Sequence, residues 1–455
     1  MFYAGLDVGS TFLKGGVLDL AGRCVRQTVR RASPNFLSAA CPGAREVDPE
    51  RMATLASELL GDLLAVEPRI EGVLLSGQMH GLVLVSPSGS ALRPAITWQD
   101  TRTLQSGAGK SAYELLQERL DPVVSEEIGR EIGPGHPATQ LWQFGLRGEL
   151  PCGAAPLSIG DFIAVRLTGA APVTHPTNAS AHGLYSLPAG DWHHELIANL
   201  GLQTLSWPAI VPEGTIVGHW RGQGRSLPVF VPLGDQQAAL LGVDLRDDEL
   251  SLNIATGSQI SCRSNSWRST GSQVRPLLAG TYLHTLTHLP AGRALARLLG
   301  LFVEPLVRLG QVPPEAEIWS LLDSLARNAA PDNLLVDLSF FPCRTGQMGS
   351  FTHIQESSLN WGCIFSAALK AMAENYWTFA ARLDPARPWK EVAYSGGLVQ
   401  KLPLLRERIT ARFRCRDRVA ENSEDALSGL LVYALHHAGL NPGSAWNKHP
   451  QRNGT

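Results

Sequence analysis

Residues 2–18 read FYAGLDVGSTFLKGGVL. Two apolar runs, 2–6 and 12–18, flank a small polar segment and predict two strands joined by a tight turn. Glycine lets backbone N–H groups approach a phosphate, hydroxyls can donate to it, and a neighbouring carboxylate can hold Mg²⁺ through water. An ordinary hairpin turn is the alternative for this segment taken alone. The candidate phosphate- and metal-binding residues here are Asp7, Gly9, Ser10, Thr11 and Lys14.

The second half of the chain repeats this order of features. An apolar run at 250–254 ends at Thr256-Gly257-Ser258, as the first run ends at Gly9. A strand predicted at 73–75 stops at Ser76, and a later one at 392–394 stops at Ser395. The unequal spacing excludes a regular short repeat and favours two α/β domains of one ancestral type. We expect a boundary near 240–250, with domains at 1–245 and 246–440 and a flexible tail at 441–455.

Small residues in the second half complete a candidate nucleotide site. Thr256, Gly257 and Ser258 form a second turn, and two such turns facing one cleft suit a nucleoside triphosphate. Gly396 and Gly397 permit the close approach of a base or ribose, although a strand-to-helix turn that needs glycine is the alternative. Neither the P-loop pattern nor the dinucleotide-binding glycine pattern occurs.

Asp235 is the candidate general base. It lies in L-G-D-Q-Q, between an apolar strand predicted at 229–231 and a helix predicted at 238–243. A base in this place would accept a proton from an attacking hydroxyl. The alternative is an aspartate that only caps the helix.

Three further segments carry the side chains that a polyhydroxylated ligand needs. Amides and carboxylates bind diols, and an aromatic face covers C–H groups. Taken alone, the histidine and the tryptophan of this set are better explained as structural core residues than as ligand contacts, and the methionine is explained by packing. The candidates are Gln78, Met79, His80, Trp98, Asp100 and Asn178.

Composition narrows the class of protein. The chain has 455 residues, 44% of them apolar, and a formal net charge of −2, so no basic surplus favours a nucleic-acid partner. No apolar run approaches the ~20 residues of a membrane span, and Asp7 interrupts any signal-peptide core. The seven cysteines include no C-x-x-C pair, which favours reduced thiols over disulfides or zinc. We expect a cytoplasmic enzyme or ligand-binding protein, monomeric or homodimeric, with no membrane or nucleic-acid partner.

Taken in order, the motifs resemble those of the FGGY carbohydrate kinases. They are D-V-G-S-T, S-G-Q-M-H-G, T-W-Q-D-x-R, G-D-Q-Q-A-A, N-I-A-T-G-S-Q and S-G-G-L, and they run from Asp7 to the S-G-G-L at 395–398, within a resemblance that extends to about Gly439. The resemblance implies an α/β fold of two ribonuclease H/actin-like domains flanking a catalytic cleft. It places ATP on the C-terminal domain and a small-molecule sugar mainly on the N-terminal one.

The resemblance also suggests a role for each matched residue. Asp235 matches the catalytic base and Asp7 the Mg²⁺-linked carboxylate, and both are expected near the metal. One segment departs from the family: many members carry Gly-Glu-Arg where this chain has P-C-R-T-G-Q at 342–347, and residues 284–300 also diverge. The remaining matches are Ser10 and Thr11 (first phosphate turn), Thr256 and Gly257 (second turn), Gly396 and Gly397 (adenosine), and Gln78, Met79, His80, Asp100 and Asn178 (sugar).

The expected activity is ATP-dependent phosphorylation of the terminal hydroxyl of a ketose. T-W-Q-D-x-R, N-A-S before Gly-x-Tyr, and L-N-I-x-T look most like the family members that phosphorylate sedoheptulose. D-xylulose is the alternative substrate, since S-G-Q-M-H-G is shared with xylulose-phosphorylating members. A sugar- and ATP-binding regulator without turnover is the alternative of a different class.

Overall fold

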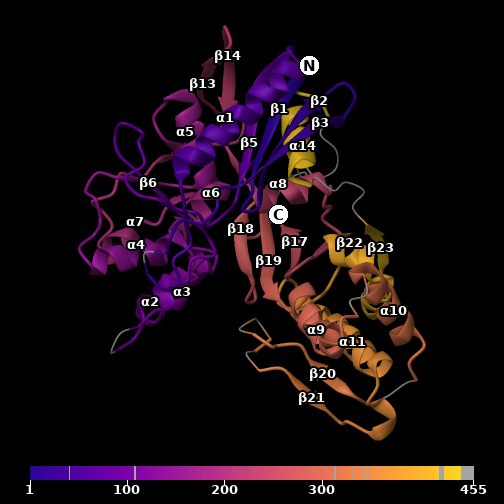
Figure 1. Cartoon of the computed structure of the whole chain (residues 1–455). Helices are drawn as coiled ribbons and strands as arrows, with labels where there is room; N and C mark the ends of the chain where they lie inside the picture. The colour runs from indigo at the N-terminus through magenta and orange to yellow at the C-terminus, as the bar shows by residue number, and fades with distance from the viewer. Residues whose placement is uncertain are drawn as a thin grey trace, which may run out of the picture.

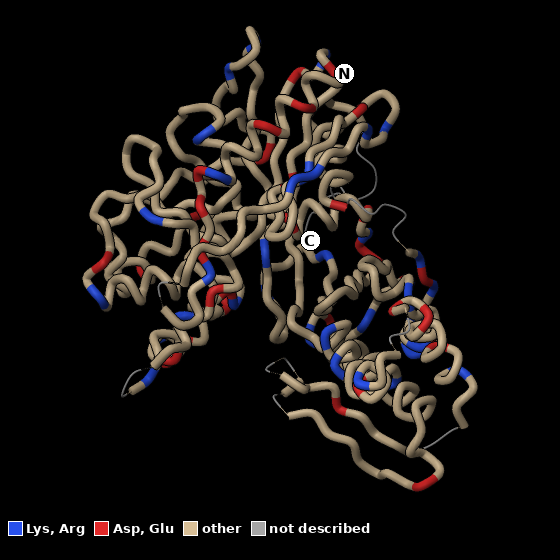
Figure 2. Tube along the Cα trace, viewed as in Figure 1, with Lys and Arg blue, Asp and Glu red and all other residues tan. Residues whose placement is uncertain are grey.

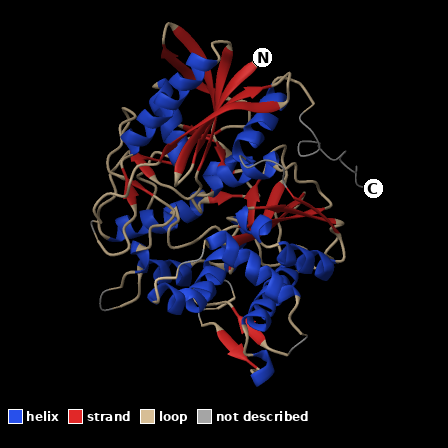
Figure 3. Cartoon of the chain, turned by 45° about the vertical axis from the view of Figure 1, so that its right-hand side comes forward, coloured by secondary structure: helices blue, strands red, loops and turns tan. Residues whose placement is uncertain are grey.

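The computed structural model describes residues 1–39, 41–106, 109–311, 314–330, 333–341, 343, 345–346, 348–419 and 425–441. Positions 442–455 of the predicted flexible tail lie outside the described residues, as do three positions of the substituted loop at 342–347. The described residues form two large sheets with helices around each of them, together with several two-stranded sheets (Figures 1 and 3). Among the described residues, no helix has the length and apolar character needed to cross a membrane.

The first sheet has the strand order β13-β14-β5-β1-β2-β3, and β15 also pairs with β5. β1 runs antiparallel to β2 and parallel to β5, so the predicted turn after Asp7 does join two neighbouring strands. The strands are β1 (Phe2–Val8), β2 (Phe12–Asp19), β3 (Cys24–Ala32), β5 (Ile70–Gly77), β13 (Ile216–Gly222), β14 (Arg225–Phe230) and β15 (Leu233–Gly234).

Helices cover both faces of this sheet because successive strand residues point to opposite sides. Ala4 and Leu6 of β1 pack in one core with α1 (Pro49–Val66) and α5 (Ile159–Thr168). Tyr3 belongs to a second core with α8 (Asp235–Gly242) and α14 (Asp425–His437). α1 begins at Pro49, and the Asp48 carboxylate caps it by accepting the N–H groups of Glu50 and Arg51.

A long insertion between β5 and β14 builds a layer with its own core. It lies to one side of the first sheet in Figure 1. Its main helices are α2 (Ala112–Arg119), α3 (Pro122–Glu127), α4 (Pro137–Leu146), α6 (Pro176–Ser180) and α7 (His194–Asn199). Its short strands are β6 (Val83–Val85), β7 (Ala95–Ile96), β8 (Ala155–Leu157), β9 (Val173–Thr174), β10 (Tyr185–Ser186), β11 (Asp191–Trp192) and β12 (Ala209–Ile210); β4 (Glu46–Val47) pairs with β7.

The second sheet repeats the pattern of the first. Its order is β18-β19-β17-β16-β22-β23, with β16 antiparallel to β17 and parallel to β22. This matches β1, β2 and β5 and supports the predicted duplication. The strands are β16 (Glu249–Ile254), β17 (Ser258–Ser264), β18 (Gln273–Pro276), β19 (Tyr282–Leu289), β22 (Glu391–Ser395) and β23 (Arg416–Val419).

The helices near the second sheet share one apolar core with it. They are α9 (Gly292–Arg308), α10 (Glu315–Arg327), α11 (Trp361–Ala380), α12 (Gly397–Lys401) and α13 (Pro403–Phe413). A small two-stranded sheet, β20 (Leu335–Asp337) and β21 (Ser350–Thr352), extends from it. We call the first sheet with its helices and insertion the first lobe, and the second sheet with α9–α13 the second lobe. Acidic and basic side chains are interspersed along both (Figure 2).

The last described helix differs from the predicted division of the chain. Residues 246–440 were expected to form the second domain, but α14 packs on β1, β2 and α8 of the first lobe. The close approach of α14 to α8 needs glycine, because a Cβ on Gly429 would lie 1.7 Å from the Ala238 carbonyl oxygen. The chain therefore returns to its first lobe at the end, while the boundary near 245 stays a prediction.

Candidate active site

Three strand ends of the first sheet bring Asp7 and Asp235 to the same edge. β5 lies between β1 and β15, and its Ser76 is in register with Asp7 on one side and Leu233 on the other. All three strands are parallel, so their carboxyl ends meet. Ser76 Oγ donates to Asp7 Oδ1 over 2.9 Å. The two carboxylates that the sequence singled out therefore flank the end of one strand.

Asp235 has the electrostatics of a base. Burial raises the pKa of its carboxyl to about 6, and the negative charge of Asp7 acts in the same direction. The backbone N–H groups of Gln236 and Met79 and the charge of Arg275 oppose this rise in pKa. At neutral pH the carboxylate is thus ionised, yet its pKa is close enough to 7 to take up a proton readily.

The segment that carries Asp235 is anchored by α6. Asn178 Nδ2 donates to the Pro232 carbonyl over 3.0 Å and to Asp161 Oδ1 over 3.2 Å. The Gly234 N–H donates to Thr177 Oγ1 over 3.0 Å. Asn178 therefore fixes the backbone just before the base, and its direct contact with sugar stays a prediction.

The first predicted phosphate turn lies at the surface of the same edge. The Gly9 N–H donates to the Phe12 carbonyl over 3.1 Å, which closes the turn. Ser10 and Thr11 are exposed, and Lys14 on β2 is in register with Asp7. The turn thus exposes two hydroxyl-bearing residues close in sequence to Asp7 and Lys14, and phosphate binding by them stays a prediction.

The second predicted turn occupies the equivalent place in the second lobe. Thr256 and Gly257 are exposed between β16 and β17. The Ser258 hydroxyl instead faces inward, where it accepts a hydrogen bond from Tyr376 over 2.8 Å. Gly396 follows β22, the parallel neighbour of β16, and its φ of +89° is one that glycine adopts without strain. The turn at 256–258 and the turn at 396–397 therefore follow two neighbouring strands, β16 and β22.

The predicted sugar residues after β5 form a strained, buried corner. His80 has a φ of +63°, which is costly for a residue with a side chain and is typical of functional sites. Gln78 is 3% exposed, and its Oε1 has no hydrogen-bond partner among the described residues. A buried acceptor without a partner is expensive, so a ligand donor would stabilise it.

The two candidate sugar residues in segment 97–102 differ in their exposure to solvent. Trp98 is 42% exposed, which leaves an aromatic face available. Asp100 is fully buried, and its oxygens accept hydrogen bonds from the Arg45 N–H over 2.7 Å and from the Arg102 side chain. Sugar binding by either residue stays a prediction, and the contacts of Asp100 are those of a residue that holds a loop.

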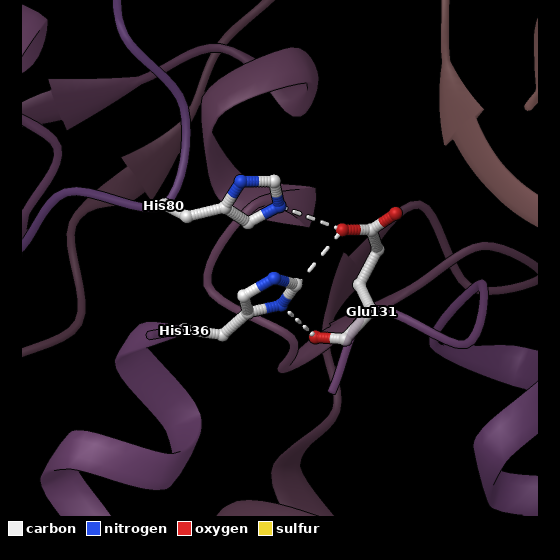
Figure 4. Close-up of side chains that lie close together, drawn as sticks. All are labelled: His80, Glu131 and His136. Atoms are coloured by element: carbon white, nitrogen blue, oxygen red, sulfur yellow. Dashed lines mark hydrogen bonds and ion pairs between the residues drawn. The ribbon is translucent and has the colours of Figure 1, made fainter. Parts of the chain in front are cut away.

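A cluster that the sequence did not predict lies beside His80 (Figure 4). His80 Nε2 lies 2.8 Å from Glu131 Oε2, and His136 Nδ1 lies 2.9 Å from the Glu131 backbone oxygen. Arg275, on β18 of the second lobe, donates from Nε to Glu131 Oε1 over 2.7 Å. Burial alone would raise the pKa of Glu131, but Arg275 and His80 hold it below its usual range.

The three clustered side chains are poorly arranged to bind a metal ion, although their ligand atoms lie within 4.8 Å of one another. The imidazole rings of His80 and His136 are stacked, with centroids 3.8 Å apart and planes 19° from parallel. Lone pairs lie in the ring planes, so two stacked rings cannot both aim at one ion. The Arg275 guanidinium also donates to both oxygens of the Glu131 carboxylate, which would otherwise be metal ligands. Burial lowers the pKa of both imidazoles, to about 3 for His136, so both rings are neutral near pH 7.

Sequence patterns gave no sign of Glu131, His136, Arg275 or Gln236 as partners. Gln236 directly follows Asp235, and the other three lie in segments without a clear pattern of apolar residues. Only the fold brings the four residues together. Glu131 precedes a glycine- and proline-rich segment at 133–137, and Arg275 lies on β18 of the second sheet.

Comparison with known proteins identifies the family. A family model described as the N-terminal domain of the FGGY family of carbohydrate kinases matches residues 2–242. The chain belongs to the FGGY family of carbohydrate kinases. This membership makes it a sugar kinase, with a small-molecule sugar as acceptor and ATP as the implied phosphoryl donor.

Relatives of this sugar kinase extend over the whole chain. Human sedoheptulokinase is 23% identical over 95% of this chain and 97% of its own length. A xylulose kinase from Rhodospirillum rubrum superposes with a TM-score of 0.84 at 20% identity, covering 98% of this chain and 92% of that one. A gluconate kinase from Lactobacillus acidophilus gives 0.83 at 19% identity, covering 98% and 90%. The predicted fold of two actin-like domains is thus confirmed.

Proposed function

We propose that this kinase transfers the γ-phosphoryl group of ATP to the terminal hydroxyl of a ketose, with sedoheptulose as the expected substrate. The observation that carries the reaction is the placement of Asp235, a largely buried carboxylate whose pKa is raised, beside Asp7 at the end of β5. The full-length similarity to human sedoheptulokinase favours the substrate.

Asp235 would act on the attacking hydroxyl. Its carboxylate accepts the proton as the sugar oxygen bonds to the γ-phosphorus, and the bond from that phosphorus to the β–γ bridging oxygen breaks to release ADP. The segment anchored by Asn178 and Thr177 keeps the base in place for this transfer. The exposed turns at 9–11 and 256–257 would hold the phosphates through backbone N–H and hydroxyl groups.

The residues at this edge fit Mg²⁺, which the family implies. Asp7 and Asp235 are close enough for their charges to repel, and hard divalent cations prefer such carboxylate oxygens. When bound, the ion would neutralise phosphate charge. Asp7 is the better placed to hold it through water, because Asp235 must remain free to accept a proton.

We call the buried corner formed by Gln78, Met79 and His80 after β5 the sugar corner. Its charge balance favours a neutral substrate. The buried Arg275 guanidinium lies 3.8 Å from the Met79 sulfur, but it is paired with Glu131. Asp7 and Asp235 then leave the corner negative. A carboxylate-bearing substrate such as an aldonate would be repelled, whereas an uncharged ketose would not.

A substrate panel with coupled detection of ADP tests this proposal. Sedoheptulose, D-xylulose, glycerol and D-gluconate would be compared with Mg²⁺ and ATP at equal concentrations. We expect the highest kcat/KM for sedoheptulose and the lowest for gluconate. A large preference for D-xylulose would overturn the substrate assignment. Ligand-induced thermal stabilisation without ADP release for any sugar would instead support a regulator without turnover.

A further inference from the structure

Arg275 connects the two lobes at the sugar corner. It lies on β18 of the second lobe, whereas its partners belong to the first. Its Nε and Nη2 donate to the two oxygens of Glu131, over 2.7 and 3.2 Å. Its Nη1 donates to Gln236 Oε1 and lies 3.8 Å from the Met79 sulfur. One guanidinium thus contacts three residues of the first lobe.

These contacts form a continuous network between His80 at one side of the site and Asp235 at the other. At one end, Glu131 holds the His80 imidazole over 2.8 Å. At the other end, the Gln236 N–H donates to Asp235 Oδ1 over 2.8 Å, and the Gln236 amide reaches Thr285 of the second lobe over 3.2 Å. Arg275 and Thr285 of this network belong to the second lobe, and Gln273, also on β18, donates from Nε2 to Glu131 Oε1 over 3.2 Å.

The network is buried, so its geometry is closely constrained. Arg275 is 4% exposed and Glu131 is fully buried. A two-point pair of this kind fixes both distance and orientation, which a lysine ammonium cannot do. Adjacent backbones also meet: the Val274 N–H donates to the Gly129 carbonyl over 3.0 Å. The second lobe is therefore attached directly to the segment that carries Glu131.

We propose that Arg275 is a positioning residue through which the second lobe sets the sugar corner, by orienting His80 through Glu131 and the base through Gln236. This inference rests on the proposed sugar kinase reaction and adds a residue that determines sugar affinity from outside the first lobe. With Arg275 withdrawn, Glu131 loses its cation and His80 is no longer held at its strained backbone position. The sugar corner therefore has all of these contacts only when β18 packs against the first lobe.

Steady-state kinetics of Arg275→Gln, Arg275→Lys and Glu131→Gln test the proposal in the full chain. We expect Arg275→Gln to raise the KM for the sugar at least tenfold, with the KM for ATP changed less than twofold. Arg275→Lys should recover only part of the loss, because it supplies charge without the two-point geometry. Glu131→Gln should resemble Arg275→Gln.

Arg263→Gln is the matched control. Arg263 is another buried arginine of the second sheet, 3.3 Å from Asp247, and it lies on β17. A merely structural role for Arg275 would give both variants similar losses of Tm and similar KM values for sugar. The proposal requires the rise in KM in Arg275→Gln alone, and a sugar KM within twofold of wild type in that variant overturns it.

A second readout does not depend on turnover. The charge of Arg275 lowers the pKa of His80, as does that of His288, while Glu131 raises it. NMR of ¹³C-labelled histidine, with His80 assigned from His80→Asn, should show a higher imidazole pKa in Arg275→Gln and no change in Arg263→Gln. If wild type accepts none of the sugars, the proposed function fails, and this titration still decides whether Arg275 sets His80.

Discussion

At the scale of single residues, the proposed chemistry depends on Asp235. Its side chain follows a buried strand and begins α8, a position from which the sequence alone could not separate a helix cap from a base. In the structure Asp235 is the first residue of α8, Gly234 takes the N-cap position, and Asp235 Oδ1 accepts the N–H of Gln236. The raised pKa and the proximity of Asp7 favour the base.

Asp235→Asn should remove the proton acceptor while keeping the shape of the side chain. We expect kcat to fall by about 10²–10⁴-fold, because general base catalysis contributes roughly this much, with sugar binding largely retained. Coupled ADP release gives kcat, and calorimetry with the sugar gives the dissociation constant. Turnover close to that of wild type would refute the assignment of the base.

The pH profile should report the same group. Catalysis needs the ionised carboxylate, and the pKa of Asp235 lies near 6. We expect kcat/KM for the sugar to fall tenfold for each pH unit below about 6 and to level off above about 7. Rates measured between pH 5 and 8 at saturating Mg²⁺ and ATP check this. A profile that stays flat down to pH 5 would mean that the site leaves the pKa of this carboxyl unperturbed.

Stability should depend on pH in the opposite direction. Because the pKa of Asp235 rises from 3.8 to about 6 on folding, its contribution to stability is present at low pH and is lost as pH rises through 6. Asp235→Asn carries no such charge. It should therefore increase the free energy of unfolding by about 1–3 kcal/mol at pH 8. Urea unfolding of both proteins at pH 5 and pH 8 measures the difference, which should be smaller at pH 5.

At the scale of elements, the prediction that the nucleotide binds the second lobe depends on the strand ends of that lobe. Gly396 and Gly397 begin α12 directly after β22, but they differ in their surroundings. A Cβ on Gly396 would lie 2.4 Å from the Ile254 carbonyl oxygen, whereas none of the described atoms outside the local chain lies within 4 Å of a Cβ on Gly397. The first glycine is needed for the fold and the second leaves space for a ligand.

The pair Gly396→Ala and Gly397→Ala separates these roles. Gly396→Ala should lower the free energy of unfolding by about 1–3 kcal/mol, because the new methyl group meets backbone and φ is +89°. Gly397→Ala should leave stability within about 0.5 kcal/mol and raise the KM for ATP. Chemical denaturation and ATP kinetics check both. An unchanged KM for ATP in Gly397→Ala would move the adenosine site elsewhere.

Several strands, the two turns and the position of Asp235 could be predicted from the sequence. The runs at 2–6, 250–254 and 392–394 become β1, β16 and β22, because strands buried on both faces read as short apolar segments bounded by small residues. The two turns and Asp235 were predicted for the same reason, since they end such strands. Glu131 and Arg275 could not be predicted, because they are 144 positions apart and their pairing depends on how the lobes dock.

At the scale of the whole molecule, the two lobes are joined at more than one place. Arg275 links them at the sugar corner, and Leu240 of α8 and Val243, which directly follows this helix, share a small core with Leu283 of β19. α14 adds a third connection, since it follows the second lobe in the chain and packs on the first sheet. The helix that begins with the base is thus held between the second sheet and the C-terminal helix.

Gly429→Ala tests whether α14 sets the position of α8. The present contact leaves no room for a side chain: a Cβ at Gly429 would lie 1.7 Å from the Ala238 oxygen, and one at Gly242 would lie 1.9 Å from the Asp425 oxygen. The methyl group must push the helices apart, which should lower the free energy of unfolding by about 1–3 kcal/mol. Because Asp235 begins α8, kcat should also fall, by about tenfold, as a displacement of the base near 1 Å costs up to 100-fold.

Ser428→Ala, one residue earlier on α14, is the control, since it removes a hydroxyl without adding volume. Urea unfolding and ADP release from both variants separate the two effects of the methyl group. A loss of stability with unchanged kcat would mean that α8 is held by the second lobe alone. A loss of both in Gly429→Ala, with neither in Ser428→Ala, is expected if the position of the base depends on the C-terminal helix, and thus on the return of the chain to its first lobe.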